Sequence, residues 1–573
     1  MVTTLGNLTD DVLDRVARNP DSVAFARREG DAWIDVTITE FRDEVMSIAK
    51  GLISAGIGAG DRVALLSKTR YEWTLFDYAI WWVGAVTVPI YETSSVGQIT
   101  WILEDSGAVA CIVESAEHAD RVAEARGSAT APATVWTIDA GAVDAVVALG
   151  ASTTDDALEA RRAQITSDSI ATLIYTSGTT GRPKGCVLTH GNFRFELGGA
   201  IEILPELFDA EGASTLLFLP LAHVFARIIQ VGAIRSDTKL GHTADVADLV
   251  THLGEFHPSF ILAVPRVFEK VFNAASQRAY ADGKGKIFDA AVATAIAHSK
   301  GIDTGKTSIA VKLKHGLFDK LVYSKLRTTL GGRAAYALSG GAPLGDRLAH
   351  FYRGIGLPIL EGYGLTETTA ALTVNTPDQI KIGTVGRPLP GTDVKVADDG
   401  ELLFRGGQVF TTYWQNDEAT ASVLSADGWF STGDLGDVDS DGFVKITGRK
   451  KEILVTAGGK NVAPAQLEDL VRAHPYVSQC LVVGDGKPFI AALVTIDPEA
   501  FTGPHDDPKL LAEVQKAIDE ANTQVSRAES IRKFVIMDDD WTEVNGYLTP
   551  SFKVKRNRIM EDFHDQIEAL FTR

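Results

Sequence analysis

The chain has 573 residues, of which 45% are hydrophobic and 23% are charged, the balance of an ordinary globular protein. Its length corresponds to about four domain-sized units, enough to bury a large core. The formal net charge of −20 argues against a nucleic-acid partner, because a surface that binds nucleic acid is basic.

The sequence predicts a cytoplasmic protein that has no transmembrane helix. Its longest apolar stretch, residues 79–90, is too short to span a bilayer and contains Pro89. The chain does not begin with a basic region followed by an apolar core, so we expect no secretory signal. Cys111, Cys186 and Cys480 lie far apart in apolar surroundings, which indicates buried thiols in a reducing compartment rather than disulfides or metal ligands.

Helix-like and strand-like segments alternate from residue 35 to residue 158. The helix-like segments are 41–55 and 73–84, and the strand-like runs are 62–66, 86–90 and 109–113. Such alternation predicts a parallel sheet covered by helices. Toward the C-terminus, strand-like runs at 481–484, 489–496 and 534–537 accompany helix-like segments at 464–473 and 509–528, which predicts a second, compact domain.

The most informative stretch is Tyr175 to Gly185, which reads Tyr-Thr-Ser-Gly-Thr-Thr-Gly-Arg-Pro-Lys-Gly between two apolar runs that predict paired strands. Its glycines let backbone N–H groups approach a ligand, its hydroxyl groups add donors, and Lys184 adds a positive charge. This combination suits a polyphosphate. A Walker A loop has Ser or Thr after its lysine, whereas Gly185 follows Lys184. A plain surface loop would explain the glycines and hydroxyls but not the Pro-Lys-Gly exit between two strands.

Two later stretches carry groups that suit a nucleotide and a metal ion. Ser339–Pro343, which reads Ser-Gly-Gly-Ala-Pro, follows a strand-like run at 334–338 and lets a flat ring approach the backbone. Further along, Tyr363, Thr366 and Glu367 supply an aromatic plane, a hydroxyl and a carboxylate within five residues. A carboxylate near a triphosphate would repel it, so Glu367 predicts a divalent cation between the two.

Three further candidates rest on weaker signals. Asp434 follows a glycine turn before a strand-like run at 442–447, so its carboxylate can accept hydrogen bonds from ribose hydroxyls. Lys553 lies in the basic stretch 548–556, which taken alone would be a solvated tail helix. His223 is explained equally well as a core histidine and as a residue of the substrate site.

In this order, these stretches resemble the motifs of the adenylate-forming superfamily, and in particular of its long-chain fatty acyl-CoA synthetases. The matching stretches are Tyr175–Gly185, Leu219–His223, Ser339–Pro343, Glu361–Thr368, Ser431–Asp434, Gly448–Ile453, Asn461–Pro464 and Lys553. The resemblance implies an α/β fold with a large N-terminal domain, residues 1–449, of two parallel-type, helix-covered sheets and a β subdomain. A small mobile α+β domain, residues 450–573, follows, and Lys451 matches the hinge between the two.

The resemblance also implies a role for each candidate residue. The expected ATP-binding residues are Thr176, Ser177, Gly178, Thr179, Thr180, Gly181, Lys184, Gly340, Gly341, Ala342, Glu361, Gly362, Tyr363, Gly364, Asp434 and Arg449, with Tyr363 on the adenine and Asp434 and Arg449 at the ribose. Thr366 is expected at the α-phosphate, Glu367 at Mg²⁺, and His223 beside the acyl carboxylate. Lys553 would swing into this site for adenylation, and Gly458 and Gly459 would meet the coenzyme A thiol after the small domain rotates.

The implied activity is ATP- and Mg²⁺-dependent conversion of a fatty acid to an acyl-adenylate with release of pyrophosphate, followed by transfer to coenzyme A. A preference for long chains rests on the resemblance at 89–93, 264–268 and 361–370. One alternative is a fatty acyl-AMP ligase that donates to a carrier protein. Another is a silent ATP-binding scaffold, which would have no physical need to keep five charged site residues.

The segment from Lys284 to Arg333 is basic in an otherwise acidic chain. It contains ten Lys or Arg and three acids, a local net charge of +7, with Leu313, Leu317 and Leu321 at helical spacing. A basic amphipathic helix of this kind predicts peripheral contact with an anionic membrane, such as the inner membrane surface. The more common alternative is a solvated helix whose apolar stripe packs on the protein itself.

Overall fold

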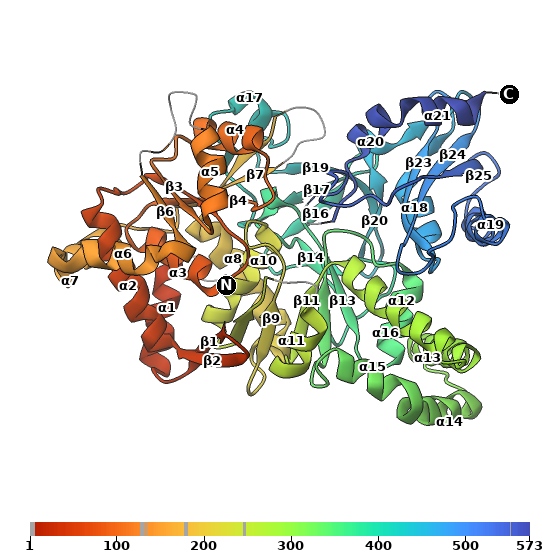
Figure 1. Cartoon of the computed structure of the whole chain (residues 1–573), viewed down its shortest axis with the longest axis horizontal. Coiled ribbons are helices and arrows are strands. Elements are labelled where there is room, and N and C mark those ends of the chain that lie inside the picture. Colours follow the sequence, from red (N-terminus) through yellow and green to blue (C-terminus); the bar gives the residue numbers. More distant parts are fainter. Residues whose placement is uncertain are drawn as a thin grey trace.

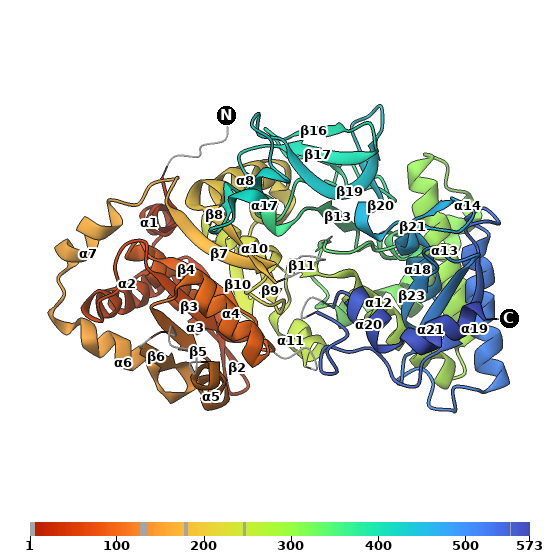
Figure 2. The ribbon, with the colours of Figure 1, turned by 90° about the horizontal axis from the view of Figure 1, so that it is seen from above.

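The computed structural model describes residues 6–125, 132, 134–176, 182–244, 248–549 and 552–572. The elements form a larger part, which ends with β20 (Val444–Arg449), and a smaller C-terminal part that packs against one side of it (Figures 1 and 2). Within these ranges no helix is both long enough and apolar enough to cross a bilayer.

A seven-stranded sheet forms the first layer of the larger part. Its strands, in spatial order, are β18 (Thr412–Tyr413), β8 (Lys184–Thr189), β7 (Ile170–Thr176), β4 (Val86–Ile90), β3 (Arg62–Leu66), β5 (Ala110–Val113) and β6 (Thr134–Thr137). The strands from β7 to β6 run parallel, whereas β8 pairs antiparallel with β7, and β18 pairs antiparallel with β8. The helices of this region are α1 (Leu8–Arg18), α2 (Ile38–Ser54), α3 (Tyr71–Trp82), α4 (Val96–Ser106), α5 (Ala116–Ala125), η1 (Ile138–Ala140), α6 (Ala142–Leu149), η2 (Gly150–Ser152) and α7 (Asp155–Arg162).

Two smaller sheets form the second layer. One has the order β2 (Ala32–Thr37), β1 (Val23–Glu29), β10 (Lys239–His242) and β9 (Ser214–Leu217), and the other has the order β11 (Phe260–Ala263), β12 (Tyr336–Ser339), β13 (Ile359–Tyr363), β14 (Thr373–Val374) and β15 (Arg387–Pro388). The Ser259 N–H donates to the Ser214 carbonyl at 2.9 Å, so the two sheets lie edge to edge. Their helices are α8 (His190–Ile203), α9 (Pro205–Phe208), α10 (Val224–Arg235), α11 (Leu249–Phe256), α12 (Pro265–Ala281), α13 (Gly285–Asp303), α14 (Ile309–Phe318), η3 (Asp319–Tyr323), α15 (Ser324–Thr329) and α16 (Asp346–Gly354).

A β subdomain and the smaller part complete the molecule. The subdomain is an antiparallel sheet of β16 (Asp393–Val396), β17 (Glu401–Arg405), β19 (Phe430–Val438) and β20. The short helix α17 (Asp417–Ala421) precedes β19 in the chain. The smaller part contains β21 (Leu454–Val455), β22 (Asn461–Val462), α18 (Pro464–Arg472), β23 (Val477–Val483), β24 (Ile490–Ile496), α19 (Pro508–Asn522), β25 (Ile531–Ile536), α20 (Arg556–Asp562) and α21 (His564–Phe571). Its buried apolar residues form clusters of their own. The predicted fold class is confirmed.

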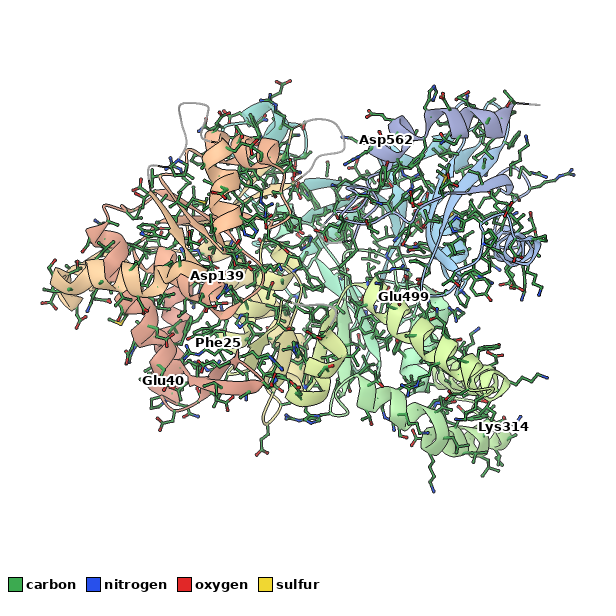
Figure 3. All side chains as sticks on the ribbon, in the orientation of Figure 1. Phe25, Glu40, Asp139, Lys314, Glu499 and Asp562 are labelled. Carbon is green, nitrogen blue, oxygen red and sulfur yellow. The ribbon has the colours of Figure 1, made fainter. Side chains whose placement is uncertain are left out.

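Most predicted elements are present, with two corrections. Strands β3 and β4 have the predicted bounds, but α19 ends at Asn522 rather than at residue 528. The Asn522 side chain exchanges two hydrogen bonds with the backbone of Ile531, at 2.8 and 3.0 Å, and so turns the chain toward β25. The basic segment is not a single helix, because Gly305 (φ +64°) separates α13 from α14. Helix α14 lies at the outer edge of the molecule, where Lys314 is labelled (Figure 3).

A fully buried ion pair joins the two layers. Asp77 of α3 contacts Arg227 of α10, and Arg227 also donates to the Thr172 hydroxyl of β7 at 2.6 Å. Asp77 accepts from the Thr87 hydroxyl of β4 at 2.7 Å and from the Gln230 amide at 3.2 Å. Burial raises the pKa of Asp77, and the nearby guanidinium opposes this rise. These contacts fix α3 and the first sheet against α10.

We expect Asp77→Ala to lower the free energy of unfolding of the larger part by about 3–5 kcal/mol, because it leaves a buried guanidinium uncompensated. Denaturant unfolding followed by tryptophan fluorescence can report this, since Trp73 and Trp81 lie beside Arg227. The double variant Asp77→Leu, Arg227→Met removes both charges and should be less destabilised than Asp77→Ala. Equal losses in the free energy of unfolding for Asp77→Ala and for the double variant would show that the uncompensated guanidinium does not cause the loss.

Candidate functional site

Strands β7 and β8 bracket the predicted phosphate loop. They pair so that Thr176 lies opposite Lys184 at the open end of the ladder. The expected loop residues Ser177, Gly178, Thr179, Thr180 and Gly181 lie outside the described residues. The indole N–H of Trp101 donates to the Pro183 carbonyl at 2.8 Å and fixes the exit of the loop. Both ends of the loop are thus held where these two paired strands meet.

Tyr413 contacts both Lys184 and Glu367. Its hydroxyl donates to Glu367 Oε1 at 2.7 Å, and the Lys184 ammonium lies 5.0 Å from the centre of its ring. The Phe410 N–H donates to the Glu367 carbonyl at 2.7 Å. The cation expected at the phosphates and the carboxylate expected at the metal therefore face one site. The sequence analysis missed Tyr413, although the aromatic run from Phe410 to Trp414 was a usable signal.

A strained turn follows η4 (Thr366–Thr368). Thr369 (φ 58°) and Ala370 (φ 122°) both have positive φ, which residues other than glycine rarely adopt. Glu196 of α8 holds this turn, because its Oε1 accepts from the Ala371 N–H at 2.7 Å. The Glu196 side chain is only 2% exposed, and burial raises its pKa well above the ordinary value. The sequence analysis missed Glu196, for which the local sequence gives no signal.

The backbone is tightly packed where β12 and β13 end. A Cβ atom at Gly364 would lie 1.4 Å from the Ala370 carbonyl oxygen, so no side chain fits there. A Cβ atom at Gly340 would lie 3.3 Å from the Gly362 carbonyl oxygen, and Gly341 has a φ of +83°. These glycines leave bare backbone at the place where a flat ring was predicted.

Ala342 and Glu361 lie beside these glycines. Ala342 is exposed just after β12, and Glu361 of β13 pairs in register with Ser339. The Leu344 N–H donates to the Glu361 carboxylate at 3.3 Å, and burial raises the pKa of this group to about 7. The Glu361 carboxyl group therefore lies in a drier environment than a carboxyl group at the protein surface.

Asp434 connects the second layer to the β subdomain. Its Oδ2 accepts from the Tyr363 hydroxyl at 2.6 Å, and its Oδ1 accepts from Arg449 Nε at 2.8 Å. In the sheet, Asp434 lies opposite Arg449. A carboxylate has about four acceptor positions, so two remain for a ligand beside these partners. The structure thus brings together the three residues expected at the adenine and the ribose.

His223 caps the helix α10. Its Nδ1 accepts from the Phe225 N–H at 3.1 Å, so the first turn of the helix fixes the ring. Burial lowers the pKa of His223 to about 3, and the charge of Lys553 contributes to this shift. The imidazole is therefore neutral at physiological pH. It lies near Lys553 rather than in the hydrophobic core.

The smaller part brings Lys553 into the site. Lys553 precedes α20, and its neighbour Phe552 (φ 61°) packs against the cores of both parts. The Lys553 Cε lies 3.9 Å from the position of a Cβ at Gly341. Lys553 is an exposed residue, but the protein around its ammonium lowers its pKa by desolvation, and the carboxylates of Asp434 and Glu367 oppose this shift.

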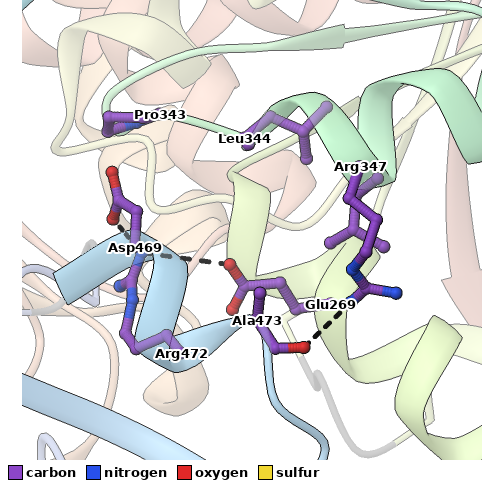
Figure 4. A pocket seen from close by; sticks show the side chains of 9 residues that line it. Glu269, Pro343, Leu344, Arg347, Asp469, Arg472 and Ala473 are labelled. Carbon is purple, nitrogen blue, oxygen red and sulfur yellow. Dashed lines mark hydrogen bonds and ion pairs between the residues drawn. The ribbon is translucent and has the colours of Figure 1, made fainter. Parts of the chain in front are cut away.

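Polar contacts hold the smaller part in this position. They line a small pocket where the two parts meet (Figure 4). Arg347 donates to the Ala473 carbonyl at 2.9 Å, and Arg472 lies 2.6 Å from Asp469 and 3.9 Å from Glu269. Burial raises the pKa of Asp469 to about 7. Rotation of the smaller part would separate α18 from α12 and α16 and so break the contacts that Arg347 and Glu269 make with it.

Three expected residues lie away from this site. Gly458 and Gly459 are exposed in the turn between β21 and β22, where the Gly459 N–H donates to the Thr456 carbonyl at 2.8 Å. Among the described residues, neither glycine forms a hydrogen bond with the larger part. Lys451 is exposed in η5 (Lys450–Glu452), the short turn that connects the two parts. The structure therefore assembles the Lys553 side of the site and leaves the glycine turn outside it.

Comparisons with known proteins agree over almost the whole chain. A model of the AMP-binding enzyme family matches residues 12–414, and a model of the AMP-binding enzyme C-terminal domain matches residues 451–573. The long-chain-fatty-acid–CoA ligase FadD15 of Mycobacterium bovis is 51% identical, over 99% of this chain and 97% of its own. The long-chain-fatty-acid–CoA ligase ACSBG2 of Xenopus laevis is 27% identical, over 97% of this chain and 82% of its own.

Solved structures share the fold at low sequence identity. The anthranilate CoA ligase AuaEII in complex with anthranoyl-AMP has a TM-score of 0.76 at 19% identity and covers 98% of both chains. O-succinylbenzoate coenzyme A synthetase (MenE) from Bacillus subtilis, in complex with ATP and a magnesium ion, has a TM-score of 0.70 at 21% identity. That match covers 96% of this chain and 98% of the other.

The buried carboxyl of Glu196 leads to a prediction about pH. Because burial raises its pKa in the folded state, its contribution to stability is full below the unfolded pKa and is lost as the pH rises toward the folded pKa. Glu196→Gln keeps an acceptor for the Ala371 N–H and cannot ionise. We expect this variant to be more stable than the original protein, by a margin that grows between about pH 5 and pH 8.

The measurement is chemical unfolding of both proteins across this pH range. Glu196→Ala is the matched control, and at every pH it should be about 1–3 kcal/mol less stable than Glu196→Gln, because it leaves the Ala371 N–H without its acceptor. Parallel pH profiles for the original protein and Glu196→Gln would contradict the assignment of a raised pKa to this carboxyl.

Proposed function

Because the chain belongs to the family of AMP-binding enzymes, we propose that it joins a long-chain fatty acid to coenzyme A through an acyl-adenylate. The observation that carries this proposal is the position of Lys553, which the smaller part places beside Gly341 and near the carboxylates of Glu367 and Asp434. The choice of substrate is supported by 51% identity to a long-chain-fatty-acid–CoA ligase over nearly the full chain.

In the first half-reaction, a fatty-acid carboxylate oxygen attacks the α-phosphorus of ATP. A new P–O bond forms, the bond to the bridging oxygen breaks, and pyrophosphate leaves with that oxygen. Both reactants are anionic, so a cation at their meeting point lowers the barrier by offsetting charge. We assign this role to Lys553, with Thr366 at the α-phosphate and Lys184 at the leaving phosphates. His223, neutral at physiological pH, adds no charge beside the acyl carboxylate.

Glu367 suits a magnesium ligand. Its Oε1 accepts from Tyr413, and among the described residues its Oε2 has no hydrogen-bond partner. No three metal-binding side chains gather in the described ranges, so a bound ion would take its other ligands from the substrate and water. One carboxylate with phosphate oxygens is a usual donor set for Mg²⁺. When bound, the ion would neutralise phosphate charge, and Tyr413 orients the carboxylate that holds it.

In the second half-reaction, the coenzyme A sulfur attacks the acyl carbonyl carbon. The C–S bond forms, the C–O bond to AMP breaks, and the thiol proton is lost to solvent. We assign the pantetheine contact to Gly458 and Gly459, which requires the smaller part to rotate about Lys451. The separate cores of the two parts support a domain boundary between residues 449 and 450. The three cysteines are buried, which supports placement in the reducing cytoplasm.

The proposal is tested by incubating the purified protein with ATP, Mg²⁺, coenzyme A and fatty acids of increasing chain length. Mass spectrometry should detect acyl-CoA and AMP, with the highest rate for long chains. Acyl-adenylate without thioester, relieved by an acyl carrier protein, would instead identify an acyl-AMP ligase. Failure to consume ATP with any fatty acid would indicate a silent protein.

We expect Lys553→Ala to reduce acyl-adenylate formation by about 100-fold or more, because it removes the cation at the developing negative charge. Transfer from a supplied acyl-adenylate to coenzyme A should stay within about twofold, because Lys553 acts only in the first domain arrangement. Lys555→Ala is the matched control, since the charged neighbours of Lys555 are Arg558 and Glu543 rather than site residues. Equal loss of both half-reactions in Lys553→Ala would contradict this assignment.

The assignment of Glu367 predicts a change in metal dependence. Glu367→Gln keeps the shape and removes the charge, so it should raise the magnesium concentration for half-maximal turnover more than it weakens ATP binding without metal. Tyr413→Phe removes the hydrogen bond to the same carboxylate and should shift the magnesium requirement in the same direction by about tenfold. Magnesium titrations of the three proteins check this. Coincident curves would exclude Glu367 as a ligand.

A further inference from the structure

Helix α14 and the turn after it carry a row of exposed apolar side chains. Ile309, Leu313, Leu317 and Leu321 follow one another at intervals of four residues, so they lie along one side of the helix and of the η3 turn that extends it. Their exposed fractions are 78%, 72%, 57% and 50% in that order. We call these four residues the outer stripe. The alternative expected from the sequence, an apolar stripe packed on the protein itself, does not describe it.

A different face of the same segment anchors it to the protein. Phe318 and Val322 pack against the main core, and the buried Tyr323 donates its hydroxyl to the Ala291 carbonyl at 2.7 Å. His315 Nε2 lies 2.6 Å from the Gly354 carbonyl oxygen. The fold therefore does not need the outer stripe for stability, and its four large apolar side chains need another explanation.

Lysines surround the outer stripe. Between residues 306 and 325 the exposed lysines are Lys306, Lys312, Lys314, Lys320 and Lys325. Within the described ranges none of these five forms an ion pair. The one acid of this stretch, Asp319, pairs with Arg327 at 2.8 Å. At 3.6 residues per turn, Lys312 and Lys314 flank Leu313 on opposite sides. This concentration of positive charge stands on a chain whose net charge is −20.

We propose that α14 docks the protein on an anionic membrane surface, with the outer stripe in the acyl-chain boundary and the lysines at the lipid headgroups. Aliphatic residues flanked by lysines suit this surface, because long lysine side chains keep their charge in the headgroup layer while their stems contact apolar groups. The proposal rests on the surface chemistry of α14 alone and is independent of the substrate proposed above.

Charge argues against the other occupants of this face. A second copy that bound through the same face would bring two sets of unpaired lysines together, because a two-fold interface pairs each patch with itself. Protein partners favour surfaces rich in aromatic residues and arginine and poor in lysine, whereas the exposed residues of α14 are aliphatic and lysine. An anionic lipid surface satisfies both the charge and the apolar stripe.

The test is co-sedimentation of the full chain with vesicles of phosphatidylglycerol or of phosphatidylcholine, at low and high salt. The original protein should bind the anionic vesicles, and high salt should weaken this binding. The double variant Leu313→Ser, Leu317→Ser should reduce the affinity for the vesicles by about tenfold or more, since it removes apolar side chains from the face that enters the membrane. Lys312→Glu, Lys314→Glu should do the same for anionic vesicles, because it reverses two charges at the surface.

The matched control is Leu511→Ser, Lys516→Glu on α19, which changes one exposed leucine and one exposed lysine elsewhere and should bind as the original protein does. Circular dichroism checks that all variants are folded. Equal binding to both lipids, unchanged binding of the α14 variants, or no binding at all would overturn the proposal. So would a lower mass of the α14 variants in lipid-free sedimentation velocity, which would identify α14 as a contact between copies.

Discussion

The constraint on which this structure depends is electrostatic, since two anions must meet in one place. A carboxylate and a triphosphate repel each other, and the site adds the carboxylates of Glu367 and Asp434. The larger part supplies Lys184 at the start of β8, and the smaller part supplies Lys553 from a segment far along the chain. Desolvation lowers the pKa of Lys553, and those carboxylates oppose the shift. The relative position of the two parts therefore decides whether the site is complete.

This dependence explains the character of the contact between the two parts. Arg347, Glu269, Asp469 and Arg472 meet there through hydrogen bonds and ion pairs around a small pocket rather than through a continuous apolar core. Polar contacts can be exchanged for contacts with water at low cost. An interface of this kind holds one arrangement without preventing another. The exposed turn of Gly458 and Gly459 is compatible with the second arrangement that we propose, in which a different face of the smaller part meets the substrate.

Local sequence was enough to predict most of the elements, but not the contacts between distant segments. The bounds of β3 and β4 followed from short apolar runs, and the pairing of β7 with β8 followed from their flanks. Tyr413 and Glu196 escaped notice because each acts on a residue far away, Glu367 and Ala371, and no local pattern reports such a partner. For α14, helical spacing predicted an apolar stripe, but only the packed structure reveals which side is covered.

The central claim is that this protein makes an acyl-adenylate before any thioester. The most direct measurement is exchange of labelled pyrophosphate into ATP without coenzyme A, because a reversible first step returns the label to ATP. The account predicts exchange that requires both Mg²⁺ and a fatty acid and that is fastest with long chains. Formation of acyl-CoA without any fatty-acid-dependent exchange would contradict it, because the carboxylate would then be activated without a reversible adenylate.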